Sequence, residues 1–455
     1  MTSKTMSDER LRRLIESEML TFEEGGVREW DLYLKQLEIK QWLPKQDKEK
    51  IDWVRRLIWM PQGRSDFRRI EPELIHVHTN FEFNTRNFWG ETTTRAYPSN
   101  EPFDDHWAIL RRLISTARDN GGGGMRMLKF LVRDKTTKKY LGVICISSDF
   151  LDLSGRDEVV GWNKKDFQRP GGKHYGKLNC MAQGQVIVPT QPFGQAFNGV
   201  KLLVMLCLSK EIADKWEEVY GDRLVGVTTT ALWGNDKKLS SYDGLEPYWQ
   251  RLTDTSGNTS FKFTDDTYHA IKAWVKRKHP HDYFRLFEEK NEKGTLKSRD
   301  SKNRCISLAL QRLGYPTEKR KSKAIRLAYM SLLYKNSAQF LKGEISKDEL
   351  VPAFDNSTKA LVRFWKFGLR GDTTVKLTKT QKKELRESHP TLPQDFSRNL
   401  QASAKARVDD SVFWAKEKGA NATIPTMGSA VEWYEDLATL TWAEAKAKYL
   451  DQVGR

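Results

Sequence analysis

The spacing of apolar residues along the 455-residue chain changes twice and so predicts three regions. From residue 1 to about 70, apolar residues such as Leu11 and Ile15 recur every three or four positions, which indicates amphipathic helices. From 71 to 265, short apolar runs lie between turns, which indicates strands mixed with helices. From 266 to 455 the spacing is helical again. We therefore expect an α/β core between an N-terminal helical region and a C-terminal helical region.

A β-hairpin is predicted inside the core. Apolar and polar residues alternate in 125–134 and again in 139–147, and the segment Asp134-Lys135-Thr136-Thr137-Lys138 between them is rich in turn-forming residues. An amphipathic helix over 107–118 precedes the hairpin and ends at the glycines of 121–124.

A strand, a loop, a long helix and a second strand follow the hairpin. The first strand is 185–189, the helix is 200–220 and the second strand is 223–230. The loop between the first strand and the helix contains Gly194. A glycine at such a turn lets backbone N–H groups and the start of a helix point at one place, which suits a phosphate group.

The loop Gln191-Pro192-Phe193-Gly194-Gln195-Ala196 resembles the pyrophosphate-binding motif of the GNAT acetyltransferases, in which acyl-coenzyme A lies against a splayed strand and the next helix start. The order helix, hairpin, strand, loop, helix, strand is also similar to that fold. The resemblance implies a GNAT-like mixed sheet and acyl-CoA or a related donor. Pro192 departs from the motif because it lacks an N–H, and Phe193 and Gln195 stand where small or basic residues are usual.

The donor-binding residues implied by this resemblance are Val188, Gln191, Gly194, Gln195, Ala196 and Asn198. Asn198 is alternatively a helix N-cap.

Positive charge is concentrated after the core. The chain has a net charge of +17 and a sequence pI near 9.5, and 270–343 alone contains 19 Lys and Arg against 6 Asp and Glu. Such a concentration favours contact with a nucleic-acid backbone, most simply DNA, over an ordinary solvated face. Two basic runs, 276–278 and 318–323, flank predicted helices at 301–313 and 323–340. The basic residues expected to contact nucleic acid are Lys276, Arg277, Lys278, Lys319, Arg320, Lys321 and Lys323.

The remaining composition narrows the class of protein. Four widely spaced cysteines form no zinc-type pair, and His76 and His78 have no third ligand spaced to join them, so we expect no metal site. The sequence shows neither a signal peptide nor an apolar run of membrane-spanning length, so we expect a cytoplasmic protein without a membrane partner.

Several blocks in order resemble a family of phage and bacterial proteins that share a region of unknown function with protein A of the Druantia antiphage defence system. The resemblance covers roughly 89–257. More distantly, the layout is similar to the Mom-type phage enzyme, an acetyltransferase-like protein that modifies adenine in DNA. The blocks are Gly142-Val143 through Ser148-Asp149-Phe150, Gly155-Arg156-Asp157, Gly161-Trp162, Leu178-Asn179, Pro189 to Leu203, Thr228-Thr229-Thr230 and Ser241-Tyr242-Asp243.

The matched residues include candidates for catalysis. Asp149 lies at a strand end, and Arg156 and Asp157 lie in the next loop. Together they could deprotonate an amine. Alternatively, their charges could form an ion pair that closes the loop. Trp162 could stack on a flipped base or cover the core. Resemblance to acetyltransferases makes Tyr242 the candidate general acid.

The leading hypothesis is a phage- or defence-associated protein that transfers an acyl-type group to a DNA base. The alternatives are a non-catalytic nucleic-acid-binding module, acting with a protein partner, and a DNA-associated virion protein.

Overall fold

The chain is described by a computed structural model that divides it into two compact units. Unit 1 comprises Met1–Leu34 and Ser256–Ile325, and unit 2 comprises Lys35–Thr255 and Arg326–Arg455. These boundaries differ from the predicted ones at 70 and 265, because the start of the chain shares a core with residues after 256. The described residues are 7–59, 69–78, 81–86, 92–97, 100, 102–115, 126–163, 165, 167, 172–190, 193–196, 199–231, 240, 242–253, 258–260, 262–292, 294, 296–298, 301–316, 321–323 and 326–367.

Unit 1 is helical. Its apolar core joins Leu11 and Ile15 to Ile271, Trp274 and other residues of the later helices, so the spacing seen in the sequence is the buried face. A short antiparallel pair of strands, one before and one after these later helices, completes the unit. Its elements are the first part of α1 (Asp8–Trp42), α9 (Asp265–Lys278), α10 (Pro280–Phe287), α11 (Ser301–Arg312), β9 (Asn258–Ser260) and β10 (Lys321–Lys323).

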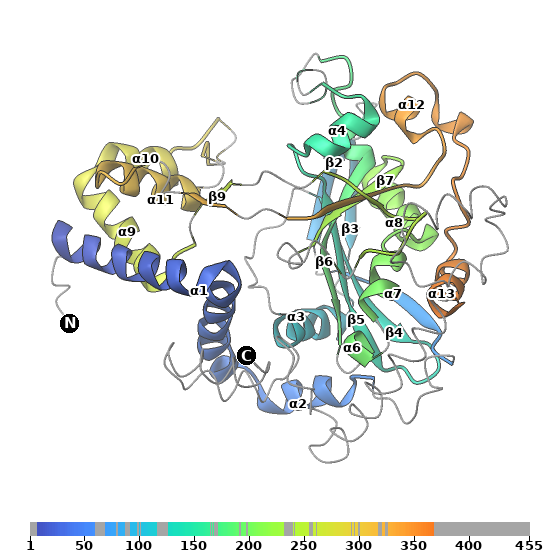
Figure 1. The fold of residues 1–455 in the computed structure, drawn as a ribbon, viewed down its shortest axis with the longest axis horizontal. Helices are drawn as coiled ribbons and strands as arrows, with labels where there is room; N and C mark the ends of the chain where they lie inside the picture. The colour runs from blue at the N-terminus through green and yellow to red at the C-terminus, as the bar shows by residue number, and fades with distance from the viewer. Residues whose placement is uncertain are drawn as a thin grey trace. The chain divides into compact units, whose positions relative to one another are not determined.

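Unit 2 is built on a seven-stranded sheet in the order β1-β4-β5-β6-β7-β11-β8 (Figure 1). Neighbouring strands are antiparallel except β6 and β7, which are parallel. The predicted α/β class with a mixed sheet is therefore confirmed. The strands are β1 (Pro72–Val77), β4 (Met127–Asp134), β5 (Tyr140–Ser148), β6 (Met181–Pro189), β7 (Gly226–Thr230), β8 (Gln250–Arg251) and β11 (Ala328–Leu332); β2 (Phe81–Arg86) and β3 (Thr92–Tyr97) pair as a separate hairpin.

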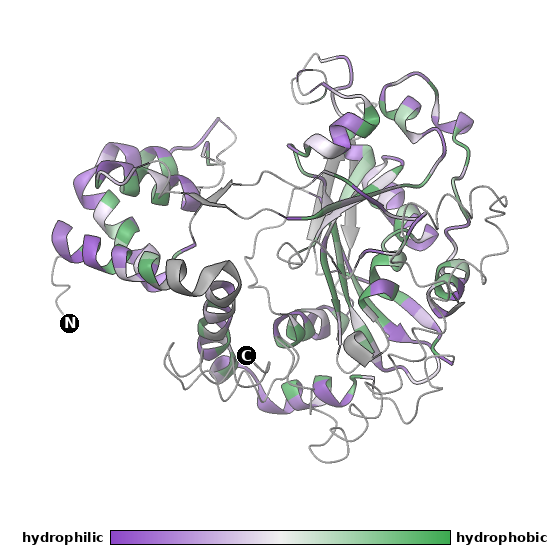
Figure 2. Ribbon diagram, viewed as in Figure 1, coloured by the Kyte–Doolittle hydropathy of each residue, from purple (hydrophilic) through white to green (hydrophobic). Residues whose placement is uncertain are grey.

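Helices cover both faces of this sheet. Residues of α3 pack on one face of β4 and β5, and residues of α7, α8 and α13 pack on the other face. Figure 2 shows hydrophobic residues concentrated in the central strands and on one side of α3. The helices are α2 (Lys48–Arg56), α3 (Phe103–Ile114), α4 (Ser154–Val160), α6 (Phe193–Ala196), α7 (Gly199–Leu206), α8 (Lys210–Tyr220), α12 (Ser337–Leu341) and α13 (Thr358–Phe367).

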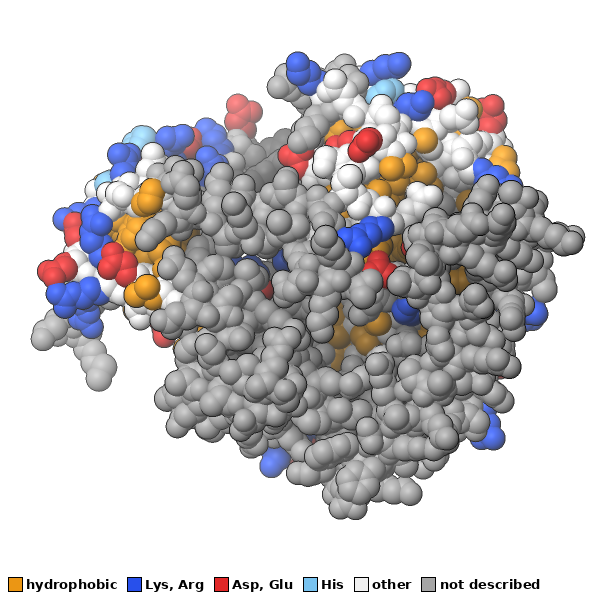
Figure 3. All heavy atoms as spheres, viewed as in Figure 1, with side chains coloured by type: hydrophobic (Ala, Val, Ile, Leu, Met, Phe, Trp, Pro, Cys, Tyr) orange, Lys and Arg blue, Asp and Glu red, His pale blue; other side chains and the backbone are white. Residues whose placement is uncertain are grey.

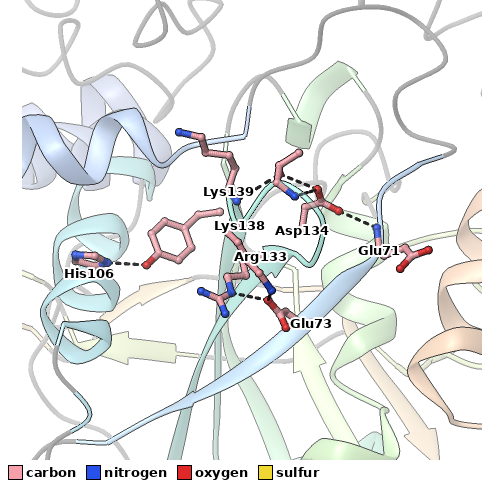
Figure 4. Close-up of polar contacts among 9 residues, drawn as sticks. Glu71, Glu73, His106, Arg133, Asp134, Lys138 and Lys139 are labelled. Atoms are coloured by element: carbon pink, nitrogen blue, oxygen red, sulfur yellow. Dashed lines mark hydrogen bonds and ion pairs between the residues drawn. The ribbon is translucent and has the colours of Figure 1, made fainter.

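The predicted β4–β5 hairpin is confirmed, and Asp134 organises its turn (Figure 4). One carboxylate oxygen accepts the N–H of Glu71 at 2.9 Å, and the other accepts the Thr137 N–H at 2.9 Å and the Thr137 hydroxyl at 2.7 Å. Close by, Glu73 accepts from Arg133 at 2.6 Å and from Lys138 at 3.0 Å.

Two helix predictions are corrected. The single helix expected over 200–220 is two helices: the first ends at Leu206, and Ser209 caps the second by accepting the Ile212 N–H. The helix expected over 323–340 is instead the end of β10, strand β11 and the start of α12, because the apolar run at its centre pairs with β7.

Candidate functional site

The most distinctive feature of the sheet is the place where β6 and β7 separate. Their parallel pairing covers only three residue pairs, from Met181↔Gly226 to Gln183↔Thr228. Strand β6 nevertheless continues to Pro189 and β7 continues to Thr230. Just beyond the last pair, the Thr229 hydroxyl donates to the Gly184 carbonyl at 2.9 Å. A hydrogen bond from a side chain therefore takes the place of the backbone hydrogen bonds where the two strands part.

A β-bulge lies on the other edge of β6 at the same level. In the pairing with β5, Cys145 faces Val186 while Ile146 faces Gly184, so Gln185 is an extra residue. A bulge leaves the extra residue outside the ladder and bends the strand locally. Gln185 is exposed. The parting of β6 from β7 thus coincides with an irregularity in β6 itself.

Tyr242 lies at this parting point. Its phenol is within hydrogen-bonding reach of the Thr229 side chain. The contact with Thr229 acts to lower the pKa of the phenol, but it is a smaller influence than burial. The residue is half-buried, but burial of the phenol raises the pKa of Tyr242. Tyr242 is therefore protonated at neutral pH.

The turn that holds Tyr242 is fixed through Asp243. One carboxylate oxygen of Asp243 accepts the Tyr329 phenol at 2.6 Å, and the other accepts the Ser240 N–H at 2.7 Å. The Asp243 carbonyl accepts the Lys201 ammonium at 2.6 Å. Burial raises the pKa of Tyr329, as does its bond to Asp243, and burial lowers the pKa of Lys201.

The loop expected to bind pyrophosphate is packed against the protein. Phe193 is fully buried, and its ring contacts Trp59 and Trp365. The Gly194 N–H donates to the Thr190 carbonyl at 2.8 Å. That N–H is therefore engaged within the loop, and the predicted phosphate contact through Gly194 does not fit this structure.

The other residues predicted to bind the donor are placed only in part. Val188 is half-buried and packs beside the α3 face of the sheet. Gln195 and Ala196 belong to α6, but their side chains lie outside the described part of the chain. Gln191 and Asn198 lie outside the described residues altogether.

The predicted acidic pair forms a buried network with Arg156. The Arg156 side chain is 0% exposed, and it donates to Asp149 at 2.9 Å and to Asp157 at 2.6 and 2.9 Å. It also donates to the Phe150 carbonyl at 2.6 Å, and the Thr228 hydroxyl donates to Asp149. The structure thus brings all three predicted residues together, in the interior of unit 2.

The network contains two carboxylates and one guanidinium. Burial lowers the pKa of Arg156, but the two carboxylates more than offset burial and the pKa is raised overall. Burial is the largest influence on Asp149 and raises its pKa, despite Arg156 and Thr228. We take Arg156 as charged, because two carboxylates face one guanidinium. An arrangement this deeply buried suits positioning of α4 better than contact with a substrate.

Trp162 belongs to the core. It is 7% exposed, its ring stacks on Phe167 with centroids 4.8 Å apart, and its indole N–H donates to the Leu341 carbonyl at 3.3 Å. The Arg156 guanidinium lies 5.5 Å from the ring centroid. A ring enclosed in this way has no open face for a base, so of the two interpretations of Trp162 the structure favours the core.

The predicted nucleic-acid contacts lie in unit 1 where they are described. Lys276, Arg277 and Lys278 are exposed in the last turn of α9, and Lys278 is 3.7 Å from Asp8. Figure 3 shows Lys and Arg side chains over this unit with acidic ones between them. Lys321 and Lys323 lie in β10 with side chains outside the description, and Lys319 and Arg320 lie outside it entirely.

Two further observations concern metal binding and membrane insertion. Among the described residues, no three His, Cys, Asp or Glu side chains gather in a way that could hold a metal ion. In that same part of the chain, every helix is too short or too polar to cross a membrane.

The chain is a mixed α/β protein whose central sheet parts between two parallel strands. Its residues 107–343, more than half of the chain, match the model of the family described as Druantia protein DruA, and the chain belongs to this family. It is similar to the Druantia protein DruA of Escherichia coli (strain UMEA 4076-1), with 24% identity over 256 residues. The match covers 52% of this chain and 59% of that relative, so the chain spans about three fifths of the relative's length. No solved structure matches the chain.

Sequence reasoning missed several residues that shape the site. The sequence marks Asp243 only as part of a family block, and it predicts a helix over the segment that contains Tyr329. Thr229 belongs to a matched block of threonines, and the structure places it in contact with Tyr242. A β-branched and aromatic run, Ala328 to Leu332, was the available signal for β11.

Proposed function

We propose that this DruA-family protein acts in antiphage defence, and that unit 2 is an acyltransferase-like core acting on a DNA base. The observation that carries this proposal is the parting of β6 from β7 after three residue pairs, with Tyr242 at the parting point. In the GNAT acetyltransferases, which the sequence resembles, the donor lies against a splayed strand of this kind. The order α3, β4–β5 hairpin, β6, helices and β7 also supports the likeness.

Tyr242 supplies the acid in this proposal. A bound acyl thioester would present a carbonyl carbon to an acceptor amine, so that a C–N bond forms while the C–S bond breaks. The Tyr242 phenol holds a proton at neutral pH and gives it to the leaving sulfur. The proton released by the amine returns to Tyr242 through solvent. Asp149 and Asp157, which are tied to Arg156, are not needed to remove that proton.

In this proposal the site holds the donor by its thioester end. The bulge at Gln185 interrupts the β5–β6 ladder at the level of the parting point, and we assign its backbone to the thioester carbonyl oxygen. The pyrophosphate of coenzyme A has no such support at Gly194, because that N–H is engaged by Thr190. The proposal is therefore an acyl thioester donor, of which acyl-CoA is one example.

Thiol release tests the proposal directly. We would incubate the protein with duplex DNA and a series of acyl-CoA donors and follow the free thiol with a thiol reagent. All four cysteines are buried, so the protein itself contributes little signal. Tyr242→Phe should slow release about a hundredfold, whereas Tyr175→Phe, at an exposed tyrosine, should not. If no donor releases thiol, or if Tyr242→Phe releases it at the wild-type rate, acyl transfer is refuted.

The proposal that DNA is the partner rests on the positive charge of the chain. The net charge of +17 and the exposed basic turn at the end of α9 support contact with phosphates. Lys276→Glu with Arg277→Glu should flatten the dependence of log affinity on log salt by about 2. The matched control is Lys45→Glu with Lys48→Glu, which reverses two exposed lysines of unit 2. Equal affinities and slopes for the two double variants would refute the role of α9.

The alternative function is a nucleic-acid-binding module without catalysis. The engaged Gly194 N–H favours it, because a phosphate contact expected of an acyl-CoA enzyme is closed. This alternative predicts salt-dependent DNA binding by the wild type together with no thiol release from any donor.

A further inference from the structure

We infer that Asp243 and Tyr329 are positioning residues, which hold the turn that carries Tyr242 against strand β11. The inference rests on the proposed role of Tyr242. It concerns how the acid is kept in place, and the contacts that carry it come from strand β7, the turn at 242–249 and strand β11.

The contacts form a closed ring. Thr229 in β7 and Tyr329 in β11 are direct register partners. The Tyr329 phenol donates to Asp243 at 2.6 Å, Asp243 adjoins Tyr242 in the chain, and Tyr242 reaches back to Thr229. The rings of Tyr242 and Tyr329 also meet edge to face, with centroids 5.5 Å apart. Each member of the ring therefore restricts the position of the phenol.

The turn that carries Tyr242 has little other regular structure. Residues 242–249 form turns, with no helix or strand of their own. Within the turn, Ser240 accepts the Tyr242 N–H at 2.9 Å and Asp243 accepts the Ser240 N–H at 2.7 Å. These bonds shape the turn but do not connect it to the sheet. The Tyr329–Asp243 bond connects the Tyr242 end of the turn to β11, and Tyr329 is a strand residue that is 1% exposed. The other end of the turn runs into β8, which also pairs with β11.

A second connection runs from Asp243 to the opposite side. Lys201 of α7 donates to the Asp243 carbonyl at 2.6 Å. Asp243 is thus held by its side chain to β11 and by its backbone to α7. Tyr242, the residue beside it, is in consequence held near both β11 and α7.

Placement of an acid matters because a displacement of about 1 Å can cost a hundredfold in rate. Tyr329→Phe keeps the ring and its edge contact with Tyr242 but removes the hydroxyl that binds Asp243. The matched control is Tyr220→Phe. Tyr220 is also buried, and its hydroxyl accepts the Met127 N–H and donates to the Met127 carbonyl, away from this turn.

The test combines turnover with hydrogen exchange. In Tyr329→Phe we expect kcat for thiol release to fall between tenfold and a hundredfold, with the donor KM within about twofold of the wild type. Amide exchange in 242–249 should accelerate roughly fivefold to tenfold, the effect of losing one hydrogen bond. Tyr220→Phe should change neither, although it loses stability. Asp243→Asn, which keeps one acceptor oxygen, should give a smaller loss of kcat than Asp243→Ala.

The outcomes separate this inference from the proposed function. If the wild type and Tyr242→Phe behave as expected but Tyr329→Phe keeps the wild-type kcat, the positioning role is refuted and acyl transfer stands. If the wild type releases no thiol, acyl transfer is refuted. Exchange then still decides the structural half of the inference, since unchanged exchange in 242–249 would show that the Asp243–Tyr329 bond does not hold the turn.

Discussion

Replacing Arg156 by methionine should strongly lower the free energy of unfolding of unit 2. Arg156 was predicted to belong to a catalytic group, but its place in the structure indicates a stabilising role. The guanidinium is 0% exposed and makes four hydrogen bonds, two to Asp157 and one each to Asp149 and the Phe150 carbonyl. Methionine fills the space but leaves two carboxylates buried without their cation. Breaking a buried ion pair in this way costs about 3 to 5 kcal/mol.

The assay is urea unfolding followed by tryptophan fluorescence, with Arg133→Met as the control. Arg133 pairs with Glu73 through side chains that are 22% and 28% exposed, and loss of such a partly solvated pair costs about 1 kcal/mol or less. Neutralising both carboxylates in Arg156→Met, with Asp149→Asn and Asp157→Asn, should recover most of the loss. Equal unfolding midpoints for Arg156→Met and Arg133→Met would refute the structural role of the network.

Two further predictions concern the sheet of unit 2. Burial in β1, aided by the Lys215 and His78 charges, lowers the pKa of His76 to about 4, so below about pH 6.5 the unfolded chain binds a proton that the folded chain does not. The free energy of unfolding should therefore fall by up to roughly 3 kcal/mol as the pH drops from 6.5 towards 4. His76→Gln should remove this part of the loss. If urea unfolding gives the variant the same pH dependence as the wild type, the prediction is wrong. Asp134→Ala should cost about 3 kcal/mol, because Asp134 is 2% exposed and accepts three hydrogen bonds that hold the hairpin turn; a loss under 1 kcal/mol at the urea midpoint would show that the turn forms without it.

The hairpin and the strands that flank the site were predictable because their signals are local. The β4–β5 turn combines alternating apolar residues with a turn segment that contains Asp134, and the structure places the turn there. The strand order was not predictable from such signals. Strand β11 pairs with β7 across about a hundred residues, and its segment follows a basic run that favours a helix when considered alone.

The candidate site was predictable only in part for the same reason. Tyr242 was proposed from a family likeness, and it does lie beside Thr229. Its connection to Tyr329 through Asp243 joins residues 86 positions apart, which no local pattern reveals. The Gly194 loop illustrates the converse limit, since its pattern predicts a phosphate contact while the Thr190 carbonyl takes the N–H.

The central claim is that unit 2 transfers an acyl-type group to a DNA base with Tyr242 as the acid. The most direct measurement is mass spectrometry of nucleosides from the DNA of cells that express the wild type, Tyr242→Phe, or neither. The account predicts a new nucleoside mass with the wild type that is lost or strongly reduced with Tyr242→Phe, and the added mass identifies the transferred group. Identical nucleoside profiles in all three would contradict it.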